Sequence, residues 1–147
     1  MKTAIIYYSR HHLNTKKLVD VIATTDENLK LIDVTAGQDV DLSEYDRVGF
    51  ASGIYYGAFA KQIQEFAAEK LPENMPVFLI ATCGSPRRGY FSAMEKIASE
   101  KKCFVIGKYQ CTGYDTFGPF KLIGGLQKGH PTDEEVQQAV QFYQTLV

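Results

Sequence analysis

The sequence contains no tryptophan, few cysteines and no excess of either charge. Its three cysteines, Cys83, Cys103 and Cys111, form neither an even set nor a C-x-x-C pair. That pattern excludes a disulfide scaffold and indicates a reducing compartment. The 147 residues include 16 Lys and Arg against 17 Asp and Glu, a net charge of −1. No overall basic field is therefore available to hold nucleic acid through its phosphates.

Long apolar runs are also missing. No stretch approaches the ~18 apolar residues that are needed to cross a bilayer, so a membrane partner is not expected. Near the start of the chain, Lys2 precedes only the apolar run 4–8, which is too short for the core of a signal peptide. The expected location is therefore the cytoplasm.

The residues that are present predict one α/β domain, 1–147. Hydrophobic residues make up 45% of the chain and charged residues 22%, which are ordinary values for a globular domain. Apolar, β-rich runs that alternate with amphipathic segments predict a doubly wound parallel sheet of five strands with helices on both faces. The strands are expected at 4–8, 29–34, 48–51, 77–81 and 103–107, the last one continuing toward 111. Helices are expected from residue 14, from 59 with an end before 72, over 91–98 and over 132–146, with at most a brief helix within 35–46. Thr132 and Glu135 have the spacing of a capping box at the start of the last helix.

Ligands of an open α/β sheet bind beyond the carboxyl ends of its strands, which here means segments 9–15, 52–59 and 82–90. The first segment enters a helix, whose free N–H groups attract anions. The hydroxyls of Ser9 and Thr15 and the amide of Asn14 suit a phosphate, and a bound anion would offset Lys16 and Lys17 in the first helical turn. The alternative interpretation is a plain helix cap beside a solvated face.

The other two segments suit a planar ring. Tyr55 and Tyr56 offer flat surfaces, and the glycines on either side of them permit close backbone approach. Segment 82–86 can offer N–H donors to a polar ring edge, with Tyr90 and Phe91 as another wall. The alternative is a pair of tyrosines that pack over the sheet edge.

Several common α/β chemistries lack their residues. Neither G-x-G-x-x-G nor G-x-x-x-x-G-K-[ST] occurs. Ser52-Gly53 stands where a phospho-acceptor receiver needs an aspartate, and Cys83 lacks the arginine spacing of a small phosphatase. Adjacent His11 and His12 are poorly spaced to share a metal ion. The sequence therefore predicts neither a catalytic residue nor a metal site.

Taken together, the three segments resemble those of the flavodoxin family, and the resemblance extends over essentially the whole chain. Segment 9–15 resembles the family's phosphate loop, one residue longer and with Leu13 where glycine is usual. The resemblance implies strand order 2-1-3-4-5 and the cofactor flavin mononucleotide (FMN). The cofactor-binding residues implied in this way are Ser9, Arg10, His11, Asn14, Thr15, Ser52, Gly53, Ile54, Tyr55, Tyr56, Gly57, Thr82, Cys83, Gly84 and Tyr90.

The function implied by the resemblance is electron transfer by an FMN-binding protein, a redox carrier rather than a turnover enzyme. Two alternatives stay open: an NAD(P)H-dependent flavin or quinone reductase, and a flavin-free scaffold module. The expected partner is a redox protein or a small electron acceptor, and the expected state is a monomer or weak dimer. Ala58 stands where family members often have an acidic residue, so charge steering toward a basic partner is not supported. Segment 112–129 is expected to cover one edge of the flavin pocket or to form a partner surface.

Overall fold

The architecture was obtained as a computed structural model, which describes residues 1–10, 14–37, 39–112 and 131–146. Its strands are β1 (Thr3–Tyr8), β2 (Leu29–Asp33), β3 (Arg47–Tyr55), β4 (Ala58–Phe59), β5 (Pro76–Cys83) and β6 (Phe104–Thr112). Its α-helices are α1 (Asn14–Thr24), α2 (Lys61–Lys70), α3 (Ser92–Glu100) and α4 (Asp133–Gln144). Short 3-10 turns occur at η1 (Val34–Ala36), η2 (Leu42–Glu44) and η3 (Arg88–Phe91).

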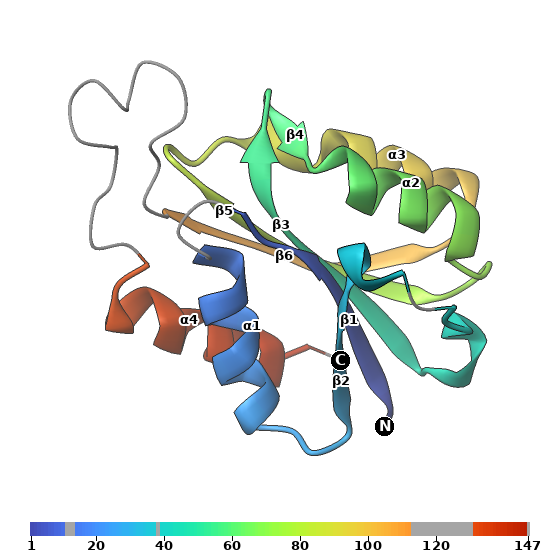
Figure 1. The fold of residues 1–147 in the computed structure, drawn as a ribbon, viewed down its shortest axis with the longest axis horizontal. Coiled ribbons are helices and arrows are strands. Elements are labelled where there is room, and N and C mark those ends of the chain that lie inside the picture. The colour runs from blue at the N-terminus through green and yellow to red at the C-terminus, as the bar shows by residue number, and fades with distance from the viewer. Residues whose placement is uncertain (11–13, 38, 113–130, 147) are drawn as a thin grey trace.

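The sheet confirms the predicted fold class. Its order is β2-β1-β3-β5-β6, and all four neighbouring pairs are parallel, so the five long strands follow the expected 2-1-3-4-5 arrangement. In Figure 1, α1 and α4 cover one face of the sheet while α2 and α3 cover the other. Burial on both faces explains why the strands read as continuous apolar runs, as in the fully apolar centre of β1.

Two segments differ from the sequence prediction. The expected brief helix within 35–46 is replaced by η1 and η2, whose first turns are capped by the carboxylates of Asp33 and Asp41. These side chains accept backbone N–H bonds and so compete with continued helix formation. Helix α2 begins at Lys61 rather than Phe59, because Ala58 and Phe59 pair with the end of β3 as strand β4.

The core has one layer on each side of the sheet. Phe50, Ile63 and Leu79 are fully buried toward α2 and α3. Phe78 and Ile5 are fully buried toward α1 and α4. None of the described helices combines the length with the apolar composition that a membrane span requires.

Helix α4 is fastened at its start by the predicted capping box. The Oγ1 of Thr132 accepts the N–H of Glu135 at 3.2 Å, and the carboxylate of Glu135 accepts the N–H of Thr132 at 2.9 Å. The second carboxylate oxygen of Glu135 also accepts from the N–H and hydroxyl of Thr112, at 3.1 and 2.7 Å. One side chain therefore caps α4 and ties it to the end of β6.

The far end of α4 packs on a buried cation. The side chain of Arg47 is only 8% exposed, and its Nε donates to Thr3 Oγ1 at 2.9 Å. Its guanidinium lies 4.8 Å from the ring centre of Tyr143 and 5.9 Å from that of Phe78. The hydroxyl of Tyr143 donates to the carboxylate of Asp26. This bond is the first cause of a lowered Asp26 pKa.

Tyr143→Phe is expected to lower the free energy of unfolding by about 1.5 kcal/mol at neutral pH, the usual worth of a hydrogen bond to a charged group. Because the folded pKa of Asp26 lies below its unfolded value, the carboxylate stabilises the fold above pH ~4 and stops doing so as the pH falls through the folded pKa. The difference between wild type and variant should therefore shrink in acid. Urea unfolding at several pH values measures it.

Tyr109→Phe supplies the control. The hydroxyl of Tyr109 donates to the uncharged carbonyl of Glu135 at 2.8 Å, so its loss should cost about 1 kcal/mol at every acidic and neutral pH. A pH-independent cost for Tyr143→Phe would remove Asp26 from the explanation.

Candidate functional site

The carboxyl ends of β1, β3 and β5 meet at one edge of the sheet. Tyr8 stands opposite Ser52, and Gly53 stands opposite Thr82. The three segments that the sequence predicts as a ligand site therefore begin side by side.

The start of α1 is organised by hydroxyl groups. The Oγ of Ser9 accepts the N–H of Lys16 at 3.1 Å and so caps the helix from seven residues away. The hydroxyls of Thr15 and Thr82 lie 2.9 Å apart in a buried contact that joins α1 to the end of β5. Accepting a bond leaves the Ser9 proton able to donate to an anion. Arg10 and Asn14 lie on either side of residues 11–13, so the predicted contact of His11 lies outside the described residues.

One sequence argument for an anion loses its basis here. The ammonium of Lys16 lies 2.7 Å from the carboxylate of Asp20, one helical turn later. Its pKa is raised, first by that hydrogen bond and then by the charge of Asp20. A bound anion is therefore not required to offset the charge of Lys16, although the helix still has no acidic residue in its first turn.

The second segment is a β-hairpin, which the sequence analysis did not predict. Strand β3 continues to Tyr55, turns through Tyr56 and Gly57, and pairs with β4. Both turn residues have positive φ, 53° and 80°, which is the geometry of a type I′ turn. Glycine adopts this conformation freely, whereas it is strained for a tyrosine. Tyr56 is nevertheless held at the tip of the hairpin with 90% of its surface exposed.

The base of the hairpin is fixed from inside. The ring of Tyr55 makes an edge contact with the ring of Tyr8, with 5.7 Å between the ring centres. The fully buried hydroxyl of Ser52 accepts the N–H of Ala60 at 2.9 Å and donates to the carbonyl of Gly53. The Ser52 side chain therefore secures the turn into α2, which leaves its backbone as the part that can face a ligand. Ile54, which precedes Tyr55 in β3, is half-buried.

The third segment leaves β5 and is held by the neighbouring strand. The thiol of Cys83 points toward the carbonyl of Cys111, 3.4 Å away, and toward the side chain of Gln110. The amide oxygen of Gln110 also accepts the N–H of Arg87 at 3.0 Å. Gly84 follows Cys83, and Tyr90 closes the loop by donating to the carbonyl of Ser85 at 2.7 Å.

The two thiols near this edge belong to different faces of the sheet. Thr82, not Cys83, stands opposite Cys111, so the side chains of the two cysteines alternate to opposite sides. Burial, with the charges of Glu135 and Cys83, raises the pKa of Cys111 to about 12. At neutral pH that thiol stays protonated. Within the described ranges, no group of three or more His, Cys, Asp or Glu side chains is placed to hold a metal ion.

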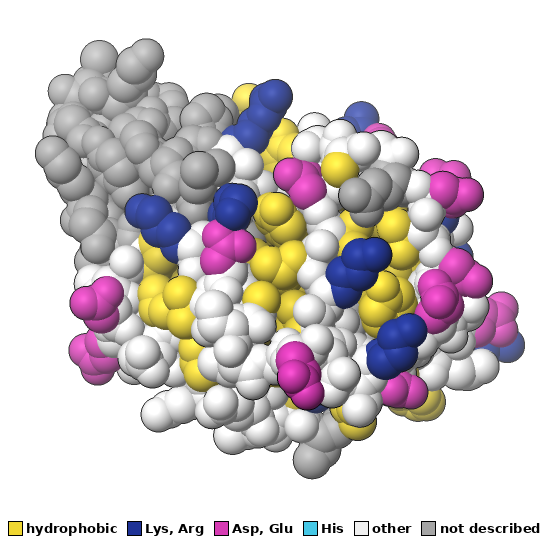
Figure 2. All heavy atoms as spheres, turned by 60° about the horizontal axis from the view of Figure 1, so that its bottom comes forward, with side chains coloured by type: hydrophobic (Ala, Val, Ile, Leu, Met, Phe, Trp, Pro, Cys, Tyr) yellow, Lys and Arg dark blue, Asp and Glu magenta, His cyan; other side chains and the backbone are white. Residues whose placement is uncertain are grey.

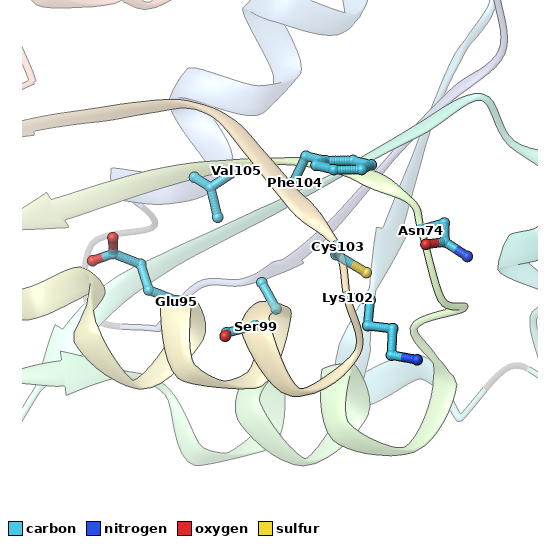
Figure 3. A pocket seen from close by; sticks show the side chains of 8 residues that line it. Asn74, Glu95, Ser99, Lys102, Cys103, Phe104 and Val105 are labelled. Carbon is cyan, nitrogen blue, oxygen red and sulfur yellow. The ribbon is translucent and has the colours of Figure 1, made fainter.

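Two grooves lie beside β6, one at the amino end of the strand and the other farther along it. One of about 540 Å³ lies between α3 and the first residues of β6 (Figure 3). Phe104, 61% exposed, and Cys103 line this groove at the amino end of the strand, away from the carboxyl-end site. The other groove, of about 610 Å³, is lined by Arg88, Phe91 and Lys108 beside the loop that follows β5.

Sequence reasoning missed two residues that shape the site. The first is Tyr8, which contacts Tyr55 and whose ring centre lies 6.0 Å from the Arg10 guanidinium. The position of Tyr8 as the last residue of β1 is the signal that could have identified it. Gln110 organises the third segment from β6, and only strand register brings it there.

Comparison with known proteins agrees with this geometry. The flavodoxin-domain profile matches residues 4–107. An uncharacterized protein of Methanocaldococcus jannaschii is 33% identical over 100% of this chain and 99% of its own length. Flavodoxin 1 from Bacillus cereus is 15% identical, with a TM-score of 0.70 over 99% of this chain and 100% of that one. A Fusobacterium nucleatum flavodoxin bound to flavin mononucleotide is 16% identical, with a TM-score of 0.65 over 98% of each chain.

The two solved structures share the fold at low identity, and the profile covers most of the sequence. With the strand order and the three adjoining segments described above, these findings show that the chain belongs to the flavodoxin family and has its flavin-binding fold.

Proposed function

We propose that this protein binds FMN at the carboxyl edge of the sheet and serves as an electron carrier. The observation that carries the proposal is the junction of the hydroxyl-rich start of α1 with the tyrosine hairpin and the end of β5, fixed by the contact of Thr15 with Thr82. A flavodoxin of the same fold is bound to FMN, which supports the choice of cofactor.

The start of α1 fits a phosphate monoester. Free N–H groups at a helix start and the positive end of the helix dipole favour an anion there. Ser9 can donate its hydroxyl proton while its oxygen holds the helix N–H, and the Arg10 guanidinium adds a positive charge nearby. Asn14 and Thr15 would complete this end of the site.

The hairpin and the third segment fit the ring system. Tyr55 and Tyr56 provide aromatic surfaces, and the absence of a side chain at Gly57 leaves its peptide group accessible. Segment 82–84, tied to β6, provides backbone groups for the polar edge of the ring. When bound, FMN supplies the redox chemistry because its ring takes up and releases electrons, and the protein positions that ring and excludes water.

Titration of the purified protein with FMN, followed by quenching of flavin fluorescence, tests the proposal. Saturation at one FMN per chain, with weaker binding of riboflavin, is the expected result. Protein that binds neither flavin would contradict the proposal and favour a scaffold role. Steady-state NAD(P)H oxidation by the FMN-loaded protein separates the carrier from a reductase, and we expect no turnover above that of free FMN.

Tyr56→Gly is expected to weaken FMN binding several-fold while raising the stability of the flavin-free protein by about 0.5–1 kcal/mol. The ring that would face the flavin is removed, and the left-handed backbone that strains Tyr56 costs glycine little. FMN titration and urea unfolding measure the two effects. Lys102→Gly is the matched control, because Lys102 also has positive φ, 58°, but lies before β6 at the other end of the sheet. It should stabilise the fold without changing FMN affinity.

A further inference from the structure

Five exposed cationic residues lie on the segments that flank the tyrosine hairpin, one of them, Lys108, set back in β6 opposite Leu79 of β5. They are Arg10 after β1, Lys61 at the start of α2, Arg87 and Arg88 in the loop after β5, and Lys108 in β6. We call this set the cationic rim. Among the described residues, one ion pair involves the rim. It joins Lys108 to Glu95 at 3.3 Å.

Packing places the rim next to the hairpin. The Arg10 guanidinium lies over Tyr8, whose ring touches Tyr55 at the base of the hairpin. On the other side, the ring of Phe59 in β4 packs against the ring of Phe91, the last residue of η3. The two ring centres are 5.9 Å apart. Because η3 begins at Arg88, the loop that carries Arg87 and Arg88 borders the hairpin directly.

The opposite end of the sheet has the opposite charge balance. Acidic side chains outnumber basic ones in the described loops that precede β2, β3, β5 and β6. These acidic residues are Asp26, Glu27, Asp39, Asp41, Glu44, Asp46 and Glu73, against Lys101 and Lys102. The acidic start of α4 lies near the carboxyl edge, but on the face of the sheet away from β4 and α2 (Figure 1).

The rim therefore differs in charge from the loops at the amino end of the sheet. On the face shown in Figure 2, basic and acidic side chains are interspersed among hydrophobic ones. The net charge of −1 thus conceals a positive region on the β4 and α2 side of the carboxyl edge, around the proposed flavin site. Such local fields orient partners during diffusional encounter.

A groove beside the rim is large enough to receive an acidic side chain. It has a volume of about 610 Å³ and lies between Arg88 and Lys108, with Ser92, Glu95 and Gln110 also lining it. Its apolar wall is Phe91, and the Lys108 ammonium lies 5.8 Å from that ring centre. A carboxylate entering here would meet Arg88 and would compete with Glu95 for Lys108.

We propose that the cationic rim is the docking face for an acidic protein that exchanges electrons with the flavin. This inference rests on the function proposed above. The rim extends from β1 to β6, three strand spacings or about 14 Å, which is more than one small anion can contact. A protein with several carboxylates can contact Arg10, the arginine pair and the groove together. Tyr56, exposed in the middle, would then lie inside the interface.

The test measures electron transfer from a dithionite-reduced plant-type [2Fe–2S] ferredoxin, a strongly acidic probe, to the FMN-loaded protein in a stopped-flow instrument. Each ferredoxin cluster is oxidised by one electron, so two are consumed for each fully reduced FMN. The second-order rate constant should fall as salt is raised. The Arg87→Glu, Arg88→Glu double variant should lower it at least tenfold at low salt.

The Lys101→Glu, Lys102→Glu double variant is the matched control. It makes the same change in net charge at the other end of the sheet, and should alter the rate constant less than twofold. Equal losses from both doubles, or a rate that rises with salt, would overturn the proposal. So would an equal loss with ferricyanide as the oxidant of the reduced protein, because the rim would then serve small anions.

A second measurement separates this proposal from the first. Oxidised ferredoxin added to the ¹⁵N-labelled protein, with or without FMN, should shift the amide signals of Arg10 and of residues 87–89 at low salt, and the arginine double variant should abolish the shifts. Shifts in a protein that binds no FMN would leave docking standing and refute the flavin assignment. FMN binding without shifts would do the reverse.

Discussion

Ser9→Ala is expected to weaken FMN binding by tenfold or more while leaving riboflavin binding unchanged. The Ser9 hydroxyl accepts the N–H of Lys16, and its proton is free to donate to a phosphate at the start of α1. A hydrogen bond to a charged group contributes about 1.5–3 kcal/mol, and each ~1.4 kcal/mol is tenfold in affinity. Riboflavin lacks the phosphate, so the ratio of the two dissociation constants isolates this contact from any general change in the pocket.

The same substitution removes a helix cap, which costs about 1 kcal/mol of stability. Asp41→Ala is therefore the control, because the Asp41 carboxylate caps η2 by accepting the N–H of Ser43 at 3.0 Å, away from the carboxyl edge. It should lower the urea midpoint and leave both flavin affinities unchanged. If Ser9→Ala weakens both flavins equally, Ser9 acts through the local structure and the phosphate lies elsewhere.

The parts of the fold that the sequence predicts correctly are those set by local patterns. Continuous apolar runs such as 77–81 mark strands buried on both faces, and the capping box of Thr132 and Glu135 marks the start of α4. These signals lie within a few residues of one another. The order of the strands follows from the alternation of strands and helices together with the family resemblance.

The hairpin escaped prediction because its signals conflict. Gly53 and Gly57 indicate a loop, and the turn lacks the Asn-Gly or Asp-Gly pair that marks a type I′ hairpin. Tyr56 occupies a conformation that sequence propensity assigns to glycine or asparagine. Tertiary packing of Tyr55 on Tyr8 and of Phe59 on Phe91 holds the strained turn in place.

Electrostatic features were missed for two different reasons. The pairing of Lys16 with Asp20 has the i, i+4 spacing of a helical ion pair and was readable from the sequence. The cationic rim was not readable, because its members come from four separate segments and their charges are cancelled in the total composition. Only the topology brings Arg10 to the same edge as Arg87 and Arg88.

Gly49→Ala is expected to lower the free energy of unfolding by about 2 to 3 kcal/mol, within the range for overpacking a well-filled core. A methyl group on Gly49 would lie 2.3 Å from the ring of Phe78 on the neighbouring strand, a distance that no real contact allows. The ring cannot move freely, because it is fully buried against Phe142 and Tyr143 of α4, with Arg47 beside it. The midpoint of thermal unfolding should fall by roughly 5 to 10 °C.

Gly89→Ala is the matched control, since no atom lies within 4 Å of the added methyl group. Its free energy of unfolding should stay within about 0.5 kcal/mol of wild type. The decisive comparison is a double-mutant cycle with Phe78→Leu, which makes room beside residue 49. If contact with the ring causes the loss, the two substitutions together should cost at least about 1 kcal/mol less than their sum. Additive costs would mean that Gly49 is needed for its backbone rather than for the space that it leaves.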